Sequence, residues 1–419
     1  MQLGTLKAER RLIVILAAIQ FTHITDFVIM MPLGPQFLRL FHITPTQFSL
    51  LVSAYTISAA VFSLLAAFFL DRWDRKRTLL FVYSGFVFGT CLCGLAETYT
   101  QLLLARVLAG AFGGTVGSVC LAIVGDVVPI ERRGRAMGIL MTAFSVATVF
   151  GLPLGLAVAA HAGWHWVFLS IALVGVALFF FAKRTVPSLA GHLSAKPESK
   201  WEEMRGILSS KNCLNGLVFS GLVVAAGFLI IPFLSPSLVT NVGVLETQLS
   251  LVYFVGGICT FFSSPLVGRA SDRWGHVKVF SFMAVLSCVP FLAITQLPAI
   301  PLWQVLFCTT FFMVVSGGRM VPTMAILTAV VPSERRGSYM SLATFFQQLC
   351  MGIASLIAGK IILSDASGRL VHFERAGYLA VAVTLLSLWM VRRLKAVVHS
   401  QTHHKPTVAI ESGDVREVI

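Results

Sequence analysis

The sequence predicts an all-α membrane protein with twelve transmembrane helices in two six-helix bundles, and two observations lead to this fold class. First, 57% of the 419 residues are hydrophobic and only 12% are charged, with a mean hydropathy of +0.85, which is too apolar for a soluble globular domain. Second, two motifs occur twice. They are Asp71-Arg72-Trp73, which returns at 272–274, and Pro129-x-Glu131-Arg132-Arg133-Gly134, which returns at 332–337. Because both repeat about half a chain apart, the chain is built from two similar halves.

Twelve apolar stretches are long enough to cross a bilayer as helices, which requires about 20 predominantly apolar residues each. They lie near residues 12–33, 48–70, 79–96, 102–125, 137–160, 164–182, 214–235, 249–268, 279–297, 303–328, 339–363 and 376–391. Lipid offers no partner to open backbone groups, and the stretches are longer than the alternating strands of a membrane barrel. We therefore predict helices.

A basic stretch at 183–211 separates six of these runs from the other six. We expect four parts: an N-terminal bundle at 1–183, a cytoplasmic linker at 184–212, a C-terminal bundle at 213–395 and a disordered polar tail at 396–419.

The distribution of positive charge predicts the topology. With both termini in the cytoplasm, the inside segments hold 26 of the 32 Lys and Arg residues, as the positive-inside rule requires. The net charge of +14 is then explained by topology and by contact with the lipid bilayer, without any nucleic acid. The first run follows Lys7, Arg10 and Arg11, as in a signal peptide, but it is too long and lacks a small-residue cleavage site. We expect it to be a retained helix.

The repeated Asp-Arg-Trp motif carries a resemblance to a known family. The motif at the end of the eighth run reads Gly268-x-x-x-Asp272-Arg273-x-Gly275-x-x-Lys278. It resembles the signature loop of the major facilitator superfamily, and the twelve runs and the two halves fit that family over essentially the whole chain. The copy after the second run has Ala67 and Asp74 in place of two glycines. The resemblance implies two bundles related by an axis along the membrane normal, with a binding site between them and alternating access.

By the same resemblance, the signature loops act as a conformational latch. Asp71 would approach the start of the eleventh helix, and Arg72 or Arg75 would pair with Asp126, which holds the cytoplasmic side closed. The alternative is that these charges only solvate a short loop. In the second copy, the corresponding residues are Gly268, Asp272, Arg273 and Gly275.

The fifth run holds a candidate bending element. Gly151-Leu152-Pro153-Leu154-Gly155 resembles the glycine-proline motif of antiporters in this superfamily, where a missing backbone donor and close packing let the helix bend. An ordinary proline kink is the alternative. The following Gly163-Trp164-His165-Trp166 is similar to the entry of the sixth helix in arabinose-efflux permeases. Together they favour the drug:proton antiporter and arabinose-efflux branch.

Asp26 is the one carboxylate well inside a hydrophobic run. A charge at a helix centre costs about 2.5–3.5 kcal/mol on insertion scales, so we expect it to have a function or a partner. A carboxyl group that binds and releases a proton is what coupling to a proton gradient requires. His23 lies three positions earlier on the same helix face and could titrate with it, although a hydrogen-bonded packing role is the alternative.

Arg106 is the candidate partner of Asp26. It lies in a stretch that resembles the superfamily's fourth-helix motif, with Gly110 four residues later. At 1.5 Å per residue, Asp26 and Arg106 lie about 13 Å and 8 Å from the outer ends of their helices, so their side chains could meet. We predict a protonation-sensitive pair, and the alternative is a static buried ion pair.

Five further residues are candidates for the substrate cavity. Arg319 has no counterpart in the first half and could hold an anionic group or extend to the surface. The others are Gln347, Gln348, Phe228 and Phe233.

Together these observations predict a secondary active transporter. The resemblance implies proton-coupled efflux of a small organic solute from a bacterial cell across the inner (plasma) membrane. Import or exchange of an organic anion is the rival, and a non-transporting membrane sensor is a third possibility. The sequence shows no nucleophile arrangement, carboxylate pair, metal-ligand cluster or Walker-type phosphate loop. We therefore expect no enzyme activity, metal or cofactor, and a monomer whose partners are the solute, protons and lipid.

Overall fold

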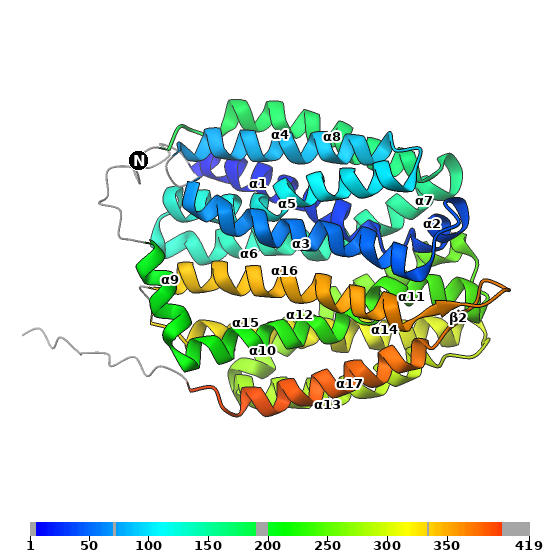
Figure 1. Cartoon of the computed structure of the whole chain (residues 1–419). Coiled ribbons are helices and arrows are strands. Elements are labelled where there is room, and N and C mark those ends of the chain that lie inside the picture. The colour runs from blue at the N-terminus through cyan, green and yellow to red at the C-terminus, as the bar shows by residue number, and fades with distance from the viewer. Residues whose placement is uncertain (1–5, 70–72, 190–199, 333–334, 396–419) are drawn as a thin grey trace, which may run out of the picture.

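Rod-like helices run side by side along one common direction, with the first half of the chain packed against the second (Figure 1). The computed structural model describes residues 6–69, 73–189, 200–332 and 335–395. Within these residues, 12 helical spans are long and apolar enough to cross a membrane. The predicted all-α fold with twelve transmembrane helices is therefore confirmed.

The first half supplies six of the spans, and two of its helices serve one span. The helices are α1 (Leu6–Ile29), α3 (Pro45–Phe69), α4 (Arg75–Gly94), α5 (Tyr99–Val127), α6 (Ile130–Val146) continued by α7 (Leu152–Ala162), and α8 (Trp164–Thr185). A short helix, α2 (Gly34–Leu40), follows the first span.

The second half repeats this order. Its helices are α10 (Lys211–Phe228) continued by α11 (Ile231–Ser237), α12 (Leu249–Trp274), α13 (His276–Thr295), α14 (Leu302–Gly318) continued by α15 (Met320–Ala329), α16 (Arg336–Ile361) and α17 (Phe373–Val391). The helix α9 (Lys200–Ser209) precedes it, and a one-turn helix, η5 (Glu246–Gln248), precedes α12.

The bundle has two distinct ends. At the terminal end, α1 begins, α17 ends and α9 lies across the helices (Figure 1). At the opposite, hairpin end lie α2, α11 and a small antiparallel hairpin of β1 (Leu363–Ser364) and β2 (Leu370–Val371), in which Leu363 pairs with Val371.

Three spans are interrupted, which the apolar runs do not reveal. In the fifth span a π-helical turn, η2 (Ala147–Gly151), separates α6 from α7. In the seventh, α10 ends at Phe228 and α11 is followed by a second π-helical turn, η4 (Leu238–Val242). In the tenth, Arg319 joins α14 to α15. Breaks of this kind free backbone groups and bend the helix axis.

Parts of both repeated motifs are helical. The motif from Gly268 to Arg273 lies inside α12, and Gly275 follows the helix with a φ of 92°, a conformation that favours glycine. Arg132 and Arg133 lie in the first turn of α6, and Arg336 begins α16. The reason is length: a helix can extend beyond the hydrocarbon core, so the end of an apolar run does not mark the end of the helix.

The apolar core closes the hairpin end but is divided at the terminal end. One buried cluster unites both halves near the hairpin end, and it includes Phe37 and Phe48 from the first half with Phe233 from the second. Toward the terminal end each half has its own cluster, around Leu16 in the first and around Phe280 in the second. Among the described residues, the buried cluster shared by both bundles lies near the hairpin end, and toward the terminal end Leu64 of α3 packs against the second-half cluster.

Candidate functional site

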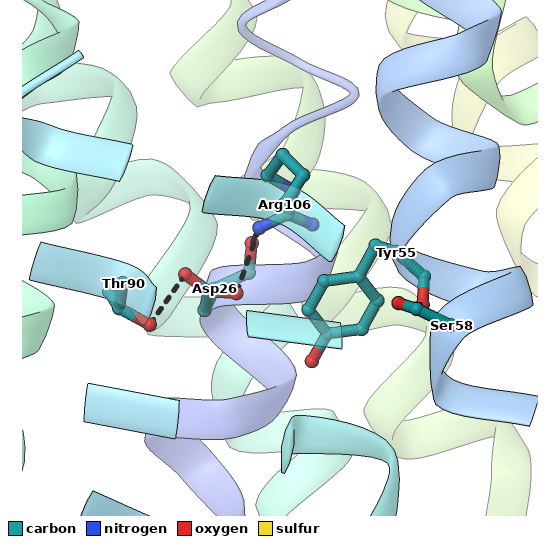
Figure 2. A network of polar contacts seen from close by, with 5 residues as sticks. All are labelled: Asp26, Tyr55, Ser58, Thr90 and Arg106. Carbon is teal, nitrogen blue, oxygen red and sulfur yellow. Dashed lines mark hydrogen bonds and ion pairs between the residues drawn. The ribbon is translucent and has the colours of Figure 1, made fainter. Parts of the chain in front are cut away.

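An ion pair lies inside the first bundle, where the chain places its two most buried opposite charges. Arg106 on α5 has its Nη1 atom 2.9 Å from Oδ2 of Asp26 on α1, and both side chains are fully enclosed. Figure 2 shows the carboxylate between Arg106 and a threonine of α4. The sequence-based expectation that these two side chains could meet agrees with this geometry, whereas the protonation-sensitive role remains a prediction.

Two residues that sequence reasoning missed complete this network. Thr90 on α4 donates from Oγ1 to Oδ1 of Asp26 at 3.1 Å. The guanidinium of Arg106 lies over the ring of Tyr55 on α3, 4.3 Å from its centroid, as a cation–π contact requires. Thr90 is a polar residue within an apolar run, and this could have marked it as a candidate. The sequence does not show which face of α4 meets α1, because that depends on the tertiary packing.

Glycines bring the four helices close enough for these contacts. A Cβ on Gly89 of α4 would come within 2.7 Å of the backbone nitrogen of Ala109 on α5. A Cβ on Gly110 of α5 would collide with Ser58 and with the backbone of Tyr55 on α3. Small residues at helix interfaces permit such close approach. Gly110, one turn after Arg106 on α5, therefore lets α3 come close enough for the Tyr55 ring to lie against the guanidinium of Arg106.

Some polar atoms of the network have no hydrogen-bond partner among the described residues. Nη1 of Arg106 also donates to the backbone carbonyl of Asp26 at 3.4 Å, in the last turn of α1, where carbonyls carry partial negative charge. The Nε and Nη2 atoms of Arg106 and the hydroxyl of Tyr55 are buried without a partner. An enclosed ion pair is costly to desolvate and costlier to break by removing one charge. The network can therefore respond strongly to any change of charge on Asp26.

His23 forms no hydrogen bond or ion pair with Asp26 in this structure. Its ring lies edge-on to Phe86 with centroids 6.0 Å apart, and its Nδ1 atom is buried without a hydrogen-bond partner. On the same helix, Oε1 of Gln20 is also buried and unpartnered. The two residues form a short polar stripe on α1 that could accept a hydrogen bond from a solute or from water.

Arg319 is buried inside the second bundle. Its guanidinium lies over the ring of Phe291 on α13 at 4.9 Å, and Nη1 is 3.4 Å from the hydroxyl of Thr384 on α17. The side chain is 2% exposed, so it does not extend to the surface. Among the described residues no carboxylate lies within ion-pair distance of it. The first bundle thus holds a neutralised arginine and the second an uncompensated one.

Two further cavity candidates, Phe228 and Phe233, lie where the two bundles meet. Phe228 stacks on Phe27 of α1 with centroids 6.1 Å apart, and Phe233 packs edge-on against Phe48 of α3 at 5.7 Å. Both therefore fill the interface toward the hairpin end rather than line an open pocket.

Gln347 and Gln348 are half-buried residues of α16. Nε2 of Gln347 and Oε1 of Gln348 are buried without hydrogen-bond partners. Each has an unused hydrogen-bonding group.

The latch candidates are only partly described. Asp71 and Arg72 lie outside the described residues. Nε of Arg75 is 3.1 Å from Oδ2 of Asp126 at the end of α5, which is one of the two pairings the resemblance implies. In the second copy, Asp272 and Arg273 are exposed at the end of α12, and neither takes part in an ion pair with a described residue.

Asp74, which stands where the family has glycine, caps α4. Its carboxylate accepts hydrogen bonds from the backbone nitrogens of Lys76 and Arg77 and from the hydroxyl of Ser188. Partial burial alone would raise the pKa of Asp74, but the hydrogen bonds from Ser188, Arg77 and Lys76 outweigh it and hold the pKa below its ordinary value. The departure from the family pattern therefore has a structural reason.

The bending candidates pack on the helix that carries Asp26. A Cβ on Gly151 would come within 2.6 Å of Oγ1 of Thr25, and a Cβ on Gly155 within 2.8 Å of Ile29. The π-helical turn ends at Gly151, and Pro153 is in the first turn of α7. A bend at this point would therefore move directly against the last two turns of α1.

A set of contacts across the two halves closes the hairpin end, and sequence reasoning did not anticipate it. Arg39 in the last turn of α2 forms an ion pair with Glu246 of η5 in the second half. Thr46 donates to the carbonyl of Gly359 on α16 at 2.7 Å. A Cβ on Gly359 would collide with the side chain of Ser49 on α3, so α3 and α16 pack closely at this end.

Comparison with known proteins gives a consistent result over the whole chain. The family model described as "Major Facilitator Superfamily" matches residues 16–238 and 216–412. An "Uncharacterized MFS-type transporter YceJ" of Bacillus subtilis is 24% identical over 90% of this chain and 94% of its own length. "Multidrug resistance protein 3" of the same species is 34% identical, but over 28% of this chain and 23% of its own length. The crystal structure of a D-xylose-proton symporter has the same fold, with a TM-score of 0.75 at 15% identity over 92% of this chain and 98% of that one.

Proposed function

Because this chain belongs to the major facilitator superfamily and is a secondary transporter that works by alternating access, we propose that it couples proton movement to the export of a small organic solute. The observation that carries the proposal is the enclosed pair of Asp26 and Arg106. Asp26 is a titratable group, and its attraction to Arg106 depends on whether it is charged. The bundle that holds the pair contacts the other bundle. The partial likeness to a multidrug resistance protein supports efflux as the direction.

Coupling follows from the energetics of the pair. When Asp26 is ionised, its attraction to Arg106 offsets the cost of removing both charges from water. When a proton binds, the arginine loses that charge–charge attraction but keeps one hydrogen bond to the backbone carbonyl of Asp26 and its contact with the Tyr55 ring. The protonated state therefore favours an arrangement in which α1 and α5 move apart or Arg106 finds water or a solute.

The bending element offers a route from this pair to the interface. Gly151 and Gly155 contact the turn of α1 that includes Thr25 and Ile29, while a Cβ on Gly257 of α12 in the second half would come within 3.1 Å of Val149 in η2. A displacement of α1 would thus be transmitted to the second bundle through the π-helical turn, which supports alternating access around the same site.

The proposal is tested by measuring proton movement that depends on an added solute. Purified protein is reconstituted in liposomes that enclose a pH-sensitive dye, and a panel of drugs, sugars and metabolites is added. We expect at least one solute to change the internal pH with wild-type protein but not with Asp26→Asn. Asp365→Asn, which alters an exposed loop carboxylate, is the matched control and should behave as wild type. Solute-driven proton movement that persists in Asp26→Asn would refute the proposal.

A second candidate function is the import or exchange of an organic anion, and Arg319 favours it. A buried arginine with no carboxylate partner in the described part of the chain is an energetic cost that a substrate's anionic group could offset. In this case uptake of a radiolabelled dicarboxylate panel would be lost in Arg319→Gln and retained in Asp26→Asn. Loss in Asp26→Asn alone would favour the first candidate.

The same proposal covers the arrangement of the chain. We place the terminal end in the cytoplasm, with bundles at 1–183 and 213–395, the linker at 184–212 and the tail at 396–419. The tail and part of the linker lie outside the described residues. The bacterial relatives support a bacterial inner membrane, and the functional unit would be a monomer.

A further inference from the structure

A groove lies at the terminal end of the first bundle, between the start of α1 and the end of α8, away from the Asp26 network. It is a hollow of about 560 Å³. Its lining residues are Lys7, Arg10, Arg11, Val14, Ile15, Phe181 and Thr185. From this geometry we propose that the groove binds an anionic phospholipid, with the headgroup phosphate on the three basic residues and an acyl chain on the apolar floor.

The spacing of the lining residues shows that one face of α1 and one face of α8 form the groove. Positions 7, 10, 11, 14 and 15 recur at the intervals that place residues on one face of an α-helix, and 181 and 185 do the same on α8. The positive-inside bias explains basic residues at a span end. It does not explain why they share a face with Val14 and Ile15, or why that face borders a hollow.

No carboxylate in the described part of the chain neutralises the three basic side chains. Lys7, Arg10 and Arg11 are exposed, and among the described residues no carboxylate lies within ion-pair distance of any of them. Glu9, the acidic residue in the first turn of α1, instead pairs with Arg132 on α6 at 3.0 Å. Positive charge near a helix N-terminus is unfavourable because the backbone dipole is already positive there. An external anion would relieve both this repulsion and the unpaired charge.

The rest of the groove selects a lipid over a free anion. The span Lys7–Ile29 begins here and the span Trp164–Thr185 ends here, so we expect the cations near the lipid headgroups and the apolar floor at the edge of the hydrocarbon core. Val14 and Phe181 are 56% and 58% exposed, which gives an acyl chain an apolar surface. The hydroxyl of Thr185 adds a donor for a phosphate or ester oxygen. Basic residues beside transmembrane helices recognise anionic headgroups in this way.

The test measures binding of soluble short-chain phosphatidylglycerol to the purified full chain in a neutral detergent, with phosphatidylcholine and inorganic phosphate as comparison ligands. Each basic residue near a membrane surface strengthens such binding roughly five-fold. We therefore expect K7Q/R10Q/R11Q to weaken phosphatidylglycerol binding on the order of 100-fold. The matched control K278Q/R392Q/K395Q removes three exposed cations at the same end and should stay within about two-fold of wild type. The variant Val14→Trp keeps every charge but fills the apolar floor of the groove, and it should weaken phosphatidylglycerol binding at least about ten-fold. It tests the proposal even if the triple variant fails to insert into the membrane.

Four results would overturn the proposal. They are phosphatidylcholine binding as tightly as phosphatidylglycerol, equal loss in the control triple variant, unchanged binding in both groove variants, or inorganic phosphate that competes at the same concentration. The last result would identify a free-anion site. The assay contains no transported solute or proton gradient, so its outcome is independent of the proposed transport function.

Discussion

Arg106 and Asp26 form an ion pair with an Nη1–Oδ2 distance of 2.9 Å in which neither side chain has any exposed surface. Breaking such a pair by removing one partner leaves a buried uncompensated charge, which typically costs about 3–5 kcal/mol, whereas removing both charges costs far less. This asymmetry makes the pair suitable for a switch, because one proton changes the balance of the whole network.

A double-mutant cycle measures this asymmetry. We expect Asp26→Asn and Arg106→Gln each to lower the free energy of unfolding by about 3 kcal/mol or more, and the double variant to lose clearly less than the sum. Chemical unfolding in detergent supplies the values. Asp365→Asn should remain within about 0.5 kcal/mol of wild type. Additive losses would show that the two charges do not depend on each other.

Arg319 should behave in the opposite way from Arg106. Since Arg319 has no carboxylate partner among the described residues, replacing it with methionine of similar length removes a desolvation cost and should leave thermal stability equal to or above wild type. Arg106→Met should be strongly destabilising because it strands Asp26. A large loss of stability in Arg319→Met without ligand would contradict the assignment of Arg319 as uncompensated.

The contact of Gly359 with Ser49 closes the hairpin end. A Cβ at Gly359 would also come within 3.0 Å of the carbonyl of Pro45, so Gly359→Ala should push α16 away from α3 and favour the state that is open at this end. Hydrogen exchange at 45–50 and 355–362 should become faster. Gly125→Ala is the control, because no atom lies within 4 Å of its added Cβ. Unchanged exchange in Gly359→Ala would mean that this contact does not hold the end closed.

The ion pair of Arg39 and Glu246 should contribute less. The Arg39 side chain is 62% exposed, and exposed pairs are worth about 0.2–1 kcal/mol and weaken with salt. Arg39→Glu should speed exchange at the hairpin end modestly, and the swapped pair R39E/E246R should restore it at low salt. If the swapped variant opens as readily as the single one, the charges do not pair across the halves in solution.

Asp74 should stabilise α4 in a pH-dependent way. Replacing an N-cap aspartate with alanine costs about 0.5–2 kcal/mol, and with glycine, the residue typical of the family, a few tenths. Because the folded pKa of Asp74 lies below its ordinary value, its stabilisation is present above that ordinary value and is lost as the pH falls through the folded pKa. Thermal unfolding of wild type, Asp74→Gly and Asp74→Ala across acid pH should show this order at neutral pH and converge in acid. An Asp74→Ala difference that is unchanged in acid would exclude an ionised cap.

The helices of this protein can be predicted from its sequence more fully than the contacts between them. The twelve spans and the two halves could be predicted because a bilayer imposes helix length and because the motifs repeat. The proximity of Asp26 and Arg106 could be predicted because both helices have a fixed rise and known ends. Thr90 and Tyr55 could not, since which faces of α4 and α3 meet the pair depends on where Gly89 and Gly110 allow backbones to touch. His23 shares a helix face with Asp26 in the sequence, yet in the structure its ring lies edge-on to Phe86 and its Nδ1 atom has no hydrogen-bond partner among the described residues.

Hydrophobicity and periodicity are local properties, so they were enough to predict the class of molecule, its number of spans, its duplication and the identity of its buried charges. The folded structure was needed to find that, among the described residues, Arg106 is neutralised and Arg319 is not, that three spans are interrupted, and that Gly359 packs against Ser49 at the hairpin end. These features arise from contacts between segments far apart in the chain. No local pattern specifies them, because each depends on which helix faces the close-packed interior brings together.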